Sequence, residues 1–260
     1  MMNLGITQQE FILFLLVFTR VTTAFVIFPV FNSAMIPQQA KVGAALFITL
    51  LLMPLINHNS IATPPDITHI IFLISREVLV GLILGFLSSL LFIAVEIAGQ
   101  LISMQMGFGI VNVYDPESNQ QVPVVGQFYM LLALMIFLAI DGHLFLLEGL
   151  NKSFTAVPLT TAHFPSALTE MFVRISSGLF ISAIKIGIPI IVTLTLTNVA
   201  LGLVARAVPQ MNVFFVGMPL NIGMGLIALA FSLPLFAYIF RSIYTHFQND
   251  FFQVLQLLGR

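Results

Sequence analysis

Long apolar stretches with almost no charged side chains dominate this sequence and limit what it can fold into. The longest apolar stretch without proline runs from His69 to Met106, and another apolar stretch runs from Ala167 to Val204. The core of a lipid bilayer, about 30 Å thick, is crossed by roughly 20 apolar helical residues. Backbone groups in lipid have to be paired within their own segment, so runs of this length predict membrane-spanning helices. A strand barrel would instead show alternating segments of about ten residues.

The composition supplies too few charges for a water-facing shell. Only 7% of the 260 residues are charged and 59% are hydrophobic, whereas soluble domains are about 25% charged. The net charge of -1 and the absence of a basic run argue against nucleic acid as a partner. Without cysteine there is no thiolate or iron–sulfur chemistry, and the five histidines lack metal-ligand spacing. We therefore predict an all-α, polytopic membrane protein without a cofactor.

Prolines and polar clusters divide the apolar stretches into about six expected spans. The helix from 69 to 106 would be about 57 Å long at about 1.5 Å per residue, so it either tilts and projects or breaks near Gly81 and Gly85. Residues 141–165 are expected as a loop, Gly217 and Pro219 as a turn, and residues 241–260 as an amphipathic surface helix. The distribution of Lys and Arg favours cytoplasmic termini. The expected spans are residues 11–28, 42–56, 69–106, 124–140, 167–204 and 220–240.

Several charged side chains fall in or near the apolar helices and are candidates for a function. A charge inside the membrane costs at least about 2.5 to 3.5 kcal/mol, so it normally faces a partner or a water-filled cavity. Such charges either conduct ions or protons, or form ion pairs that fix helices and subunits against one another, and their mixed signs favour ion pairs. The adjacent Arg76 and Glu77 are expected at the membrane interface. The candidate buried or inter-subunit charges are Arg20, Glu96, Asp141, Lys185 and Arg206.

A polar stripe and a glycine-containing loop meet at the end of the longest apolar stretch. Glu96, Gln100 and Ser103 follow an i, i+4, i+7 pattern, which places them on one helix face that meets protein or water rather than lipid. Pore lining and helix–helix hydrogen bonding both fit this pattern. Residues 107–123 contain glycines, which adopt backbone conformations closed to other residues. A movable plug and an ordinary surface loop both fit the loop's composition.

The sequence contains no motif for catalysis. No nucleophile elbow is present, no glycine-rich segment matches the phosphate-binding pattern GxxxxGK[ST], and the carboxylates are dispersed. The GxxxG spacing of Gly81 and Gly85 indicates close helix packing instead. We therefore do not expect an enzyme.

Four segments together resemble one known family. They are FPVFNSAMIPQQAKVGAALFITLLLMP at 28–54, REVLVGLILGFLSSLLFIAVEIAGQLISMQMGFG at 76–109, the Asp115–Pro116 pair, and ALGLVARAVPQMNVFFVGMPL at 200–220. In this order and at this length they are similar to the FliR family of flagellar export-apparatus membrane proteins and its relatives in virulence type III secretion. The resemblance covers most of the chain, and the AGQ…QMGF and ARxxPQMNVFFVGxPL strings are its most specific part.

The resemblance implies a core subunit of the type III export gate, which passes unfolded flagellar proteins across the bacterial inner membrane at the flagellar basal body. Its expected partners are FliP-like and FliQ-like subunits in a hetero-oligomer, together with FlhB-like and FlhA-like proteins. The implied fold has long helical hairpins, with a FliP-like part at residues 1–160 fused to a FliQ-like hairpin and tail at residues 161–260. A secondary transporter of a small solute is the alternative, although the two halves lack the internal repeat that transporters show.

The resemblance also implies that the loop after the longest helix, residues 107–122, is a plug in the closed pore. Apolar side chains close a pore by excluding water, so this role is physically reasonable. Asp115 and Pro116 would form its turn. The implied plug residues are Met106, Gly107, Phe108, Gly109, Ile110, Val111, Val113, Asp115 and Pro116.

Overall fold

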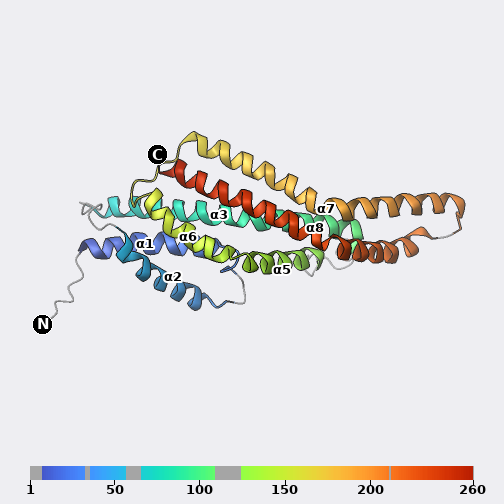
Figure 1. The fold of residues 1–260 in the computed structure, drawn as a ribbon, viewed down its shortest axis with the longest axis horizontal. Coiled ribbons are helices and arrows are strands. Elements are labelled where there is room, and N and C mark those ends of the chain that lie inside the picture. Colours follow the sequence, from blue (N-terminus) through green and yellow to red (C-terminus); the bar gives the residue numbers. More distant parts are fainter. Residues whose placement is uncertain (1–7, 33–35, 57–65, 109–123, 211, 260) are drawn as a thin grey trace. The chain divides into compact units, whose positions relative to one another are not determined.

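The computed structural model describes residues 8–32, 36–56, 66–108, 124–210 and 212–259, and these ranges hold helices and no strand (Figure 1). The all-α prediction is therefore confirmed for the described residues. The helices are α1 (Gln8–Ile27), α2 (Gln38–Leu52), the short 3-10 helix η1 (Met53–Leu55), α3 (Ile67–Met106), α5 (Val124–Ala139), α6 (Gly142–Ala156), α7 (Ser166–Ala207) and α8 (Val213–Leu258).

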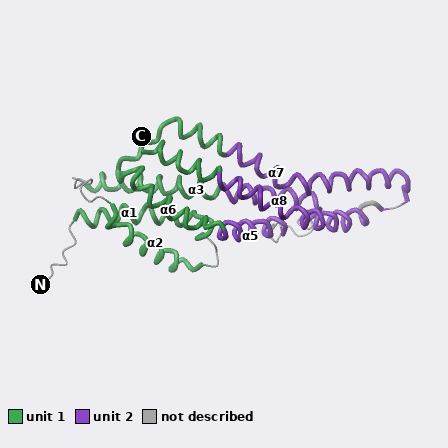
Figure 2. Tube along the Cα trace, viewed as in Figure 1, with its two compact units in different colours: residues 1–90, 140–175, 246–260 green, residues 91–139, 176–245 purple. Residues whose placement is uncertain are grey.

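The chain forms two compact units, which Figure 2 colours separately. Helices α3, α7 and α8 contribute residues to both units. The expected boundary near residue 160 follows from a resemblance and not from packing, and it stays a prediction. Unit 1 consists of Met1–Leu90, Ile140–Ile175 and His246–Arg260, and unit 2 consists of Leu91–Ala139 and Ser176–Thr245.

Five of the described helical segments are long and apolar enough to cross a membrane, as expected for a polytopic membrane protein. The α5–α6 pair, bent by 67°, would add a sixth span if it counts as one. Helix α3 continues without interruption through Gly81 and Gly85. Of the two possibilities for this overlong segment, a break near the glycines is therefore excluded.

Helix α6 occupies residues where a loop was expected, and that prediction is wrong. Asp141 has a φ of 56°, so the chain bends there after α5 and starts a second helix instead of a loop. Leu146, Leu150 and Phe154 are buried and recur every four residues. This helical period was present in the sequence, but the prolines farther along, Pro158 and Pro165, suggested a loop for the whole segment.

The expected turn at Gly217 and Pro219 is also wrong, because α8 runs through both residues. Its interior includes Pro219 and Pro234. Proline is tolerated in membrane helices where neighbouring groups satisfy the freed backbone carbonyl. The turn lies earlier, between the end of α7 at Ala207 and the start of α8 at Val213.

Residues 241–258 continue α8. The prediction of a separate amphipathic surface helix at residues 241–260 is therefore wrong. Their apolar positions do recur with helical spacing, but the side chains are buried inside unit 1. The rings of Phe145 in α6 and Phe251 in α8 are 5.5 Å apart in an edge-on arrangement. The buried apolar side chains at the end of α8 thus pack on α6 of the same chain. They include Phe251, Val254, Leu255 and Leu258.

Glycines lie at close helix contacts in both units. In unit 1, a Cβ added to Gly81 would lie 2.7 Å from the carbonyl oxygen of Arg20, and one added to Gly85 would lie 2.6 Å from the Cβ of Ile27. In unit 2, a Cβ on Gly99 would lie 3.0 Å from the backbone nitrogen of Gly126. The predicted close packing at the GxxxG spacing of α3 is therefore confirmed, and its partner is α1.

Candidate functional site

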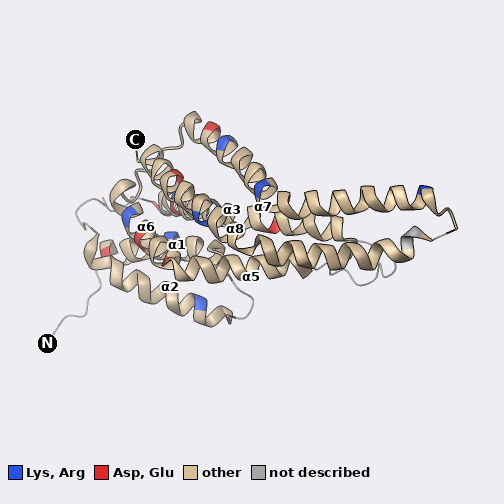
Figure 3. Cartoon of the chain, turned by 45° about the vertical axis from the view of Figure 1, so that its right-hand side comes forward, with Lys and Arg blue, Asp and Glu red and all other residues tan. Residues whose placement is uncertain are grey.

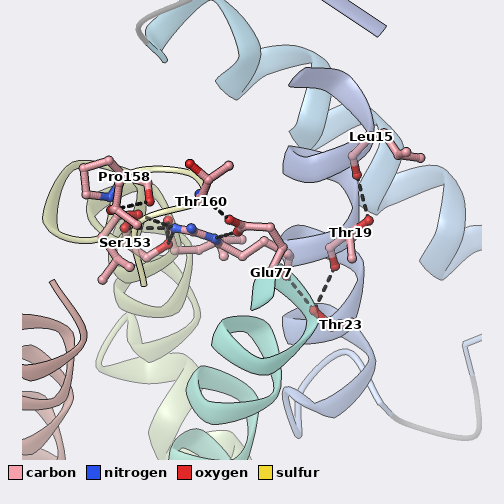
Figure 4. A network of polar contacts seen from close by, with 11 residues as sticks. Leu15, Thr19, Thr23, Glu77, Ser153, Pro158 and Thr160 are labelled. Carbon is pink, nitrogen blue, oxygen red and sulfur yellow. Dashed lines mark hydrogen bonds and ion pairs between the residues drawn. The ribbon is translucent and has the colours of Figure 1, made fainter. Parts of the chain in front are cut away.

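Arg20 of α1 and Glu77 of α3 form an ion pair inside unit 1, in the network drawn in Figure 4. The Nε of Arg20 donates to the Oε2 of Glu77 over 2.6 Å, and both side chains are 0% exposed. Each residue lies on an apolar helix, where one charge without the other would be strongly unfavourable. The pair therefore depends on the close packing of α1 against α3 at Gly81.

The same two side chains bind the backbone at the end of α6 and just beyond it. The Nη1 of Arg20 donates to the carbonyl oxygens of Ser153 at 3.0 Å and Val157 at 2.9 Å. The Oε1 of Glu77 accepts the backbone N–H of Thr160 at 3.0 Å. The Ser153 carbonyl also accepts the backbone N–H of Val157 at 2.9 Å. The C-terminal end of a helix carries partial negative charge, so a cation there is favourable. Arg20 thus caps α6 while it pairs with α3.

Arg76 holds the following residues of the α6–α7 connection. Its Nη1 donates to the carbonyl oxygen of Thr160 at 2.8 Å and its Nη2 to that of Ala162 at 2.7 Å. Its guanidinium carbon lies 5.4 Å from the ring centre of Phe72. The network of Arg20, Arg76 and Glu77 therefore fixes the connection between α6 and α7 through its backbone.

The pairing of Glu77 with Arg20 was missed from the sequence. The sequence indicates that Arg20 needs a partner, but it predicts an interfacial position for Glu77 beside Arg76. Both residues lie within proline-free apolar stretches, and their opposite charges are the one feature of the sequence that indicates a pair. That signal does not select one acid among several.

The end of α3 in unit 2 holds the first of the expected plug residues. Met106, the last residue of α3, is 0% exposed. Gly107 follows with a φ of +91°, and its N–H donates to the carbonyl oxygen of Met104 at 3.1 Å. Glycine adopts this conformation at little cost, so the chain turns away from the helix axis there, ahead of the half-buried Phe108. Outside the described residues lie Gly109, Ile110, Val111, Val113, Asp115 and Pro116.

The predicted polar stripe on α3 is divided between two environments. Glu96 and Gln100 are exposed, and the Nε2 of Gln100 donates to the Oε1 of Glu96 at 3.3 Å. Ser103 is buried, and its hydroxyl has no hydrogen-bond partner within the described part of the chain. An exposed carboxylate on an apolar helix fits a face that meets water or another protein rather than lipid.

The other candidate charges are exposed on this chain, whereas Arg20 is buried. Asp141 lies at the α5–α6 bend, Lys185 lies within α7, and Arg206 lies in the last turn of α7. Figure 3 shows how sparse charged residues are along the helices. The described charged residues of unit 2 are Glu96, Lys185, Arg206 and Arg241.

The described residues do not contain a group of three or more His, Cys, Asp or Glu side chains that could hold a metal ion. The arrangement they do contain, one buried ion pair, the capped end of α6 and close packing at glycines, fixes helices against one another. Its chemistry is that of packing and hydrogen bonding.

Comparison with known proteins places the chain among bacterial export proteins. Residues 11–247 match the family described as bacterial export proteins, family 1. The chain is 35% identical to the flagellar biosynthetic protein FliR of Bacillus subtilis (strain 168), with 95% of each chain covered. It is 32% identical to FliR of Aquifex aeolicus (strain VF5), covering 96% of this chain and 95% of the relative. It is 31% identical to FliR of Escherichia coli (strain K12), covering 80% of this chain and 79% of the relative.

Proposed function

The chain belongs to the FliR family of bacterial export proteins, family 1, and on this premise we propose that it is a core subunit of the flagellar type III export gate. With FliP-like and FliQ-like subunits it forms the channel through which unfolded flagellar proteins cross the inner membrane. The observation that carries this proposal is the family match over residues 11–247. Members of this family are parts of an export apparatus and not enzymes, and the alternative of a small-solute transporter gains no support from the match.

The exposed surface of the chain supports assembly with other subunits. Large apolar side chains are exposed along α7, including Phe180, Ile184 and Leu196. Apolar exposure alone fits lipid as well as protein, but Glu96 and Lys185 are also exposed on the apolar helices of unit 2. Charges at such positions normally face protein or water. We assign these faces to FliP-like and FliQ-like neighbours, and the long α7–α8 hairpin to the FliQ-like part of the chain.

The segment that follows Met106, residues 107–122, is the proposed plug of the closed channel. The buried side chain of Met106 and the positive φ of Gly107 support this role, because they fix where the segment leaves α3. Apolar residues beyond this turn would exclude water and ions from the pore.

Native purification in mild detergent, followed by mass measurement of the intact complex, tests the assembly. The expected result is one copy or a few copies of this chain together with FliP-like and FliQ-like chains. A monodisperse single chain that transports a small solute without companions would overturn the proposal.

Deletion of residues 107–122 tests the plug. In cells that carry the whole export apparatus, the deletion is expected to increase ion leak across the membrane while the complex still assembles. If the membrane stays sealed although the assembled complex is present at normal amount, this segment is not the plug.

A further inference from the structure

Helix α8 has a notch at Gly225 that the side chain of Met106 fills. A Cβ added to Gly225 would lie 2.7 Å from both the Cε and the Cγ of Met106, and 2.9 Å from its sulfur. Met106 is 0% exposed, and both residues belong to unit 2. Two residues away, a Cβ on Gly223 would meet nothing within 4 Å. Close packing on Met106 is therefore specific to one of these two neighbouring glycines.

The contact cannot be relieved by a small movement of the methionine tip. Methionine is flexible at its end, but the Cγ that would clash lies near the root of the side chain. A side chain at position 225 would therefore push the whole Met106 side chain out of the notch. Because Met106 is the last residue of α3, this would also move the end of that helix.

The residue after Met106 is the point where the chain turns. Gly107 has a φ of +91°, and a Cβ added there would meet only the Cγ of Met218, at 3.9 Å. There is space for a side chain at Gly107, so glycine is required for its backbone conformation and not for packing. The fixed contact and the turn are thus directly adjacent in the chain.

We propose that Met106 and Gly225 are positioning residues for the channel seal: the methionine in its glycine notch holds the end of α3 on α8, so that the following segment leaves at one defined point. This inference rests on the proposed function, in which the segment after Gly107 closes the pore. It adds that the seal depends on a contact made outside that segment, on a different helix.

A Gly225→Ala variant and its matched control, Gly223→Ala, test the proposal in cells with the complete export apparatus. Gly225→Ala is expected to raise ion leak several-fold while the amount of assembled complex stays unchanged, and Gly223→Ala is expected to leave the membrane sealed. The double variant Met106→Ala with Gly225→Ala removes the clash, so its leak is expected to be smaller than the sum of the two single variants. Equal leak in the two glycine variants would overturn the proposal.

A cross-link tests the contact without relying on the channel function. The chain has no cysteine, so a Met106→Cys, Gly225→Cys double variant has one possible internal disulfide. We expect this bond to form on oxidation in the assembled complex and the membrane to stay sealed with it in place. Absence of the cross-link would overturn the proposed contact. If deletion of residues 107–122 causes leak and Gly225→Ala does not, the positioning role is wrong but the plug is not. If neither change causes leak, both the plug and the positioning role are wrong.

Discussion

Arg20 combines three interactions in one buried side chain. It pairs with Glu77, it donates to two carbonyls at the end of α6, and its guanidinium carbon lies 4.5 Å from the ring centre of Phe154. Its Nη2 has no hydrogen-bond partner among the described residues. The desolvation of the guanidinium is therefore only partly compensated, and the pair serves to fix how α1, α3 and α6 meet more than to add net stability.

Removing one charge of this pair is expected to destabilise the protein strongly. Arg20→Met leaves Glu77 buried without its cation, and removing one partner of a buried pair typically costs about 3 to 5 kcal/mol. Thermal unfolding of the detergent-purified protein measures the loss. The control is Lys152→Met, which breaks the exposed pair with Glu148 and is expected to cost less than about 1 kcal/mol. Similar effects of both changes would contradict a structural role for the buried pair.

The charge of Arg20 could be recognised from the sequence, but its partner could not. A charge inside an apolar run is a local feature, whereas the choice of Glu77 depends on where α1 lies against α3. The close approach at Gly81 decides this, and it is a property of two packed helices. Likewise, the i, i+4 positions of Glu96 and Gln100 predicted a shared face, whereas the burial of Ser103 depends on tertiary packing.

At the scale of helices, glycines in α3 determine how closely α1 packs. Gly81→Ala is expected to destabilise unit 1, because the new Cβ would lie 2.7 Å from the carbonyl oxygen of Arg20, a backbone atom that cannot move by itself. In α2, Gly43 has nothing within 4 Å of its Cβ position. Gly43→Ala should stabilise its helix by about 0.5 to 1 kcal/mol. Thermal unfolding of the two purified variants should therefore shift in opposite directions; shifts in the same direction would contradict the packing of α1 on Gly81.

Helix α8 shows where sequence patterns mislead at this scale. Proline and glycine at 217–219 are typical of a turn, yet α8 continues through them. The tendency of proline and glycine to form a turn was overridden because the apolar residues on both sides continue one helix. Residues 213–245 of this helix pack in unit 2, and residues 246–258 pack in unit 1. The spacing of the C-terminal apolar residues did predict a helix correctly, but could not tell whether it packs on a membrane surface or on α6.

The end of α8 is therefore expected to be essential for the stability of unit 1. Phe251 is 0% exposed and fits against Gly149 of α6, whose added Cβ would lie 2.6 Å from the Phe251 Cε1 atom. Phe251→Ala should cost about 3 to 5 kcal/mol, the usual effect of removing a buried aromatic ring. The matched control is Phe231→Ala on the same helix, where the side chain is 84% exposed, and it should leave thermal unfolding of the purified chain unchanged. If the two variants unfold at the same temperature, the end of α8 does not contribute to the stability of unit 1.

At the scale of the whole molecule, charge is distributed unequally between the units. The described charges of unit 1 include ion pairs within the chain, such as Arg20 with Glu77 and Lys152 with Glu148. In unit 2, Glu96 and Lys185 are exposed on helices that are otherwise apolar. The fold class followed from hydrophobicity, which is a property of the chain itself, whereas five of the about six expected spans are single helices and the sixth depends on counting the bent α5–α6 pair as one. In the proposed complex, the role of these exposed charges would depend on the neighbouring subunits.

Lys185 provides a test of this division between stability and assembly. Reversing its charge with Lys185→Glu should leave thermal unfolding of the purified chain unchanged, because the side chain is exposed. In the proposed complex it would face an acidic group of a neighbouring subunit, and placing like charges together in such a contact costs several kcal/mol. We therefore expect fewer FliP-like or FliQ-like chains to co-purify with this variant. Lys185→Arg keeps the positive charge and should co-purify with the same amount of these chains as the unchanged protein. If Lys185→Glu assembles normally, the α7 face around this residue meets water or lipid headgroups and is not a subunit contact.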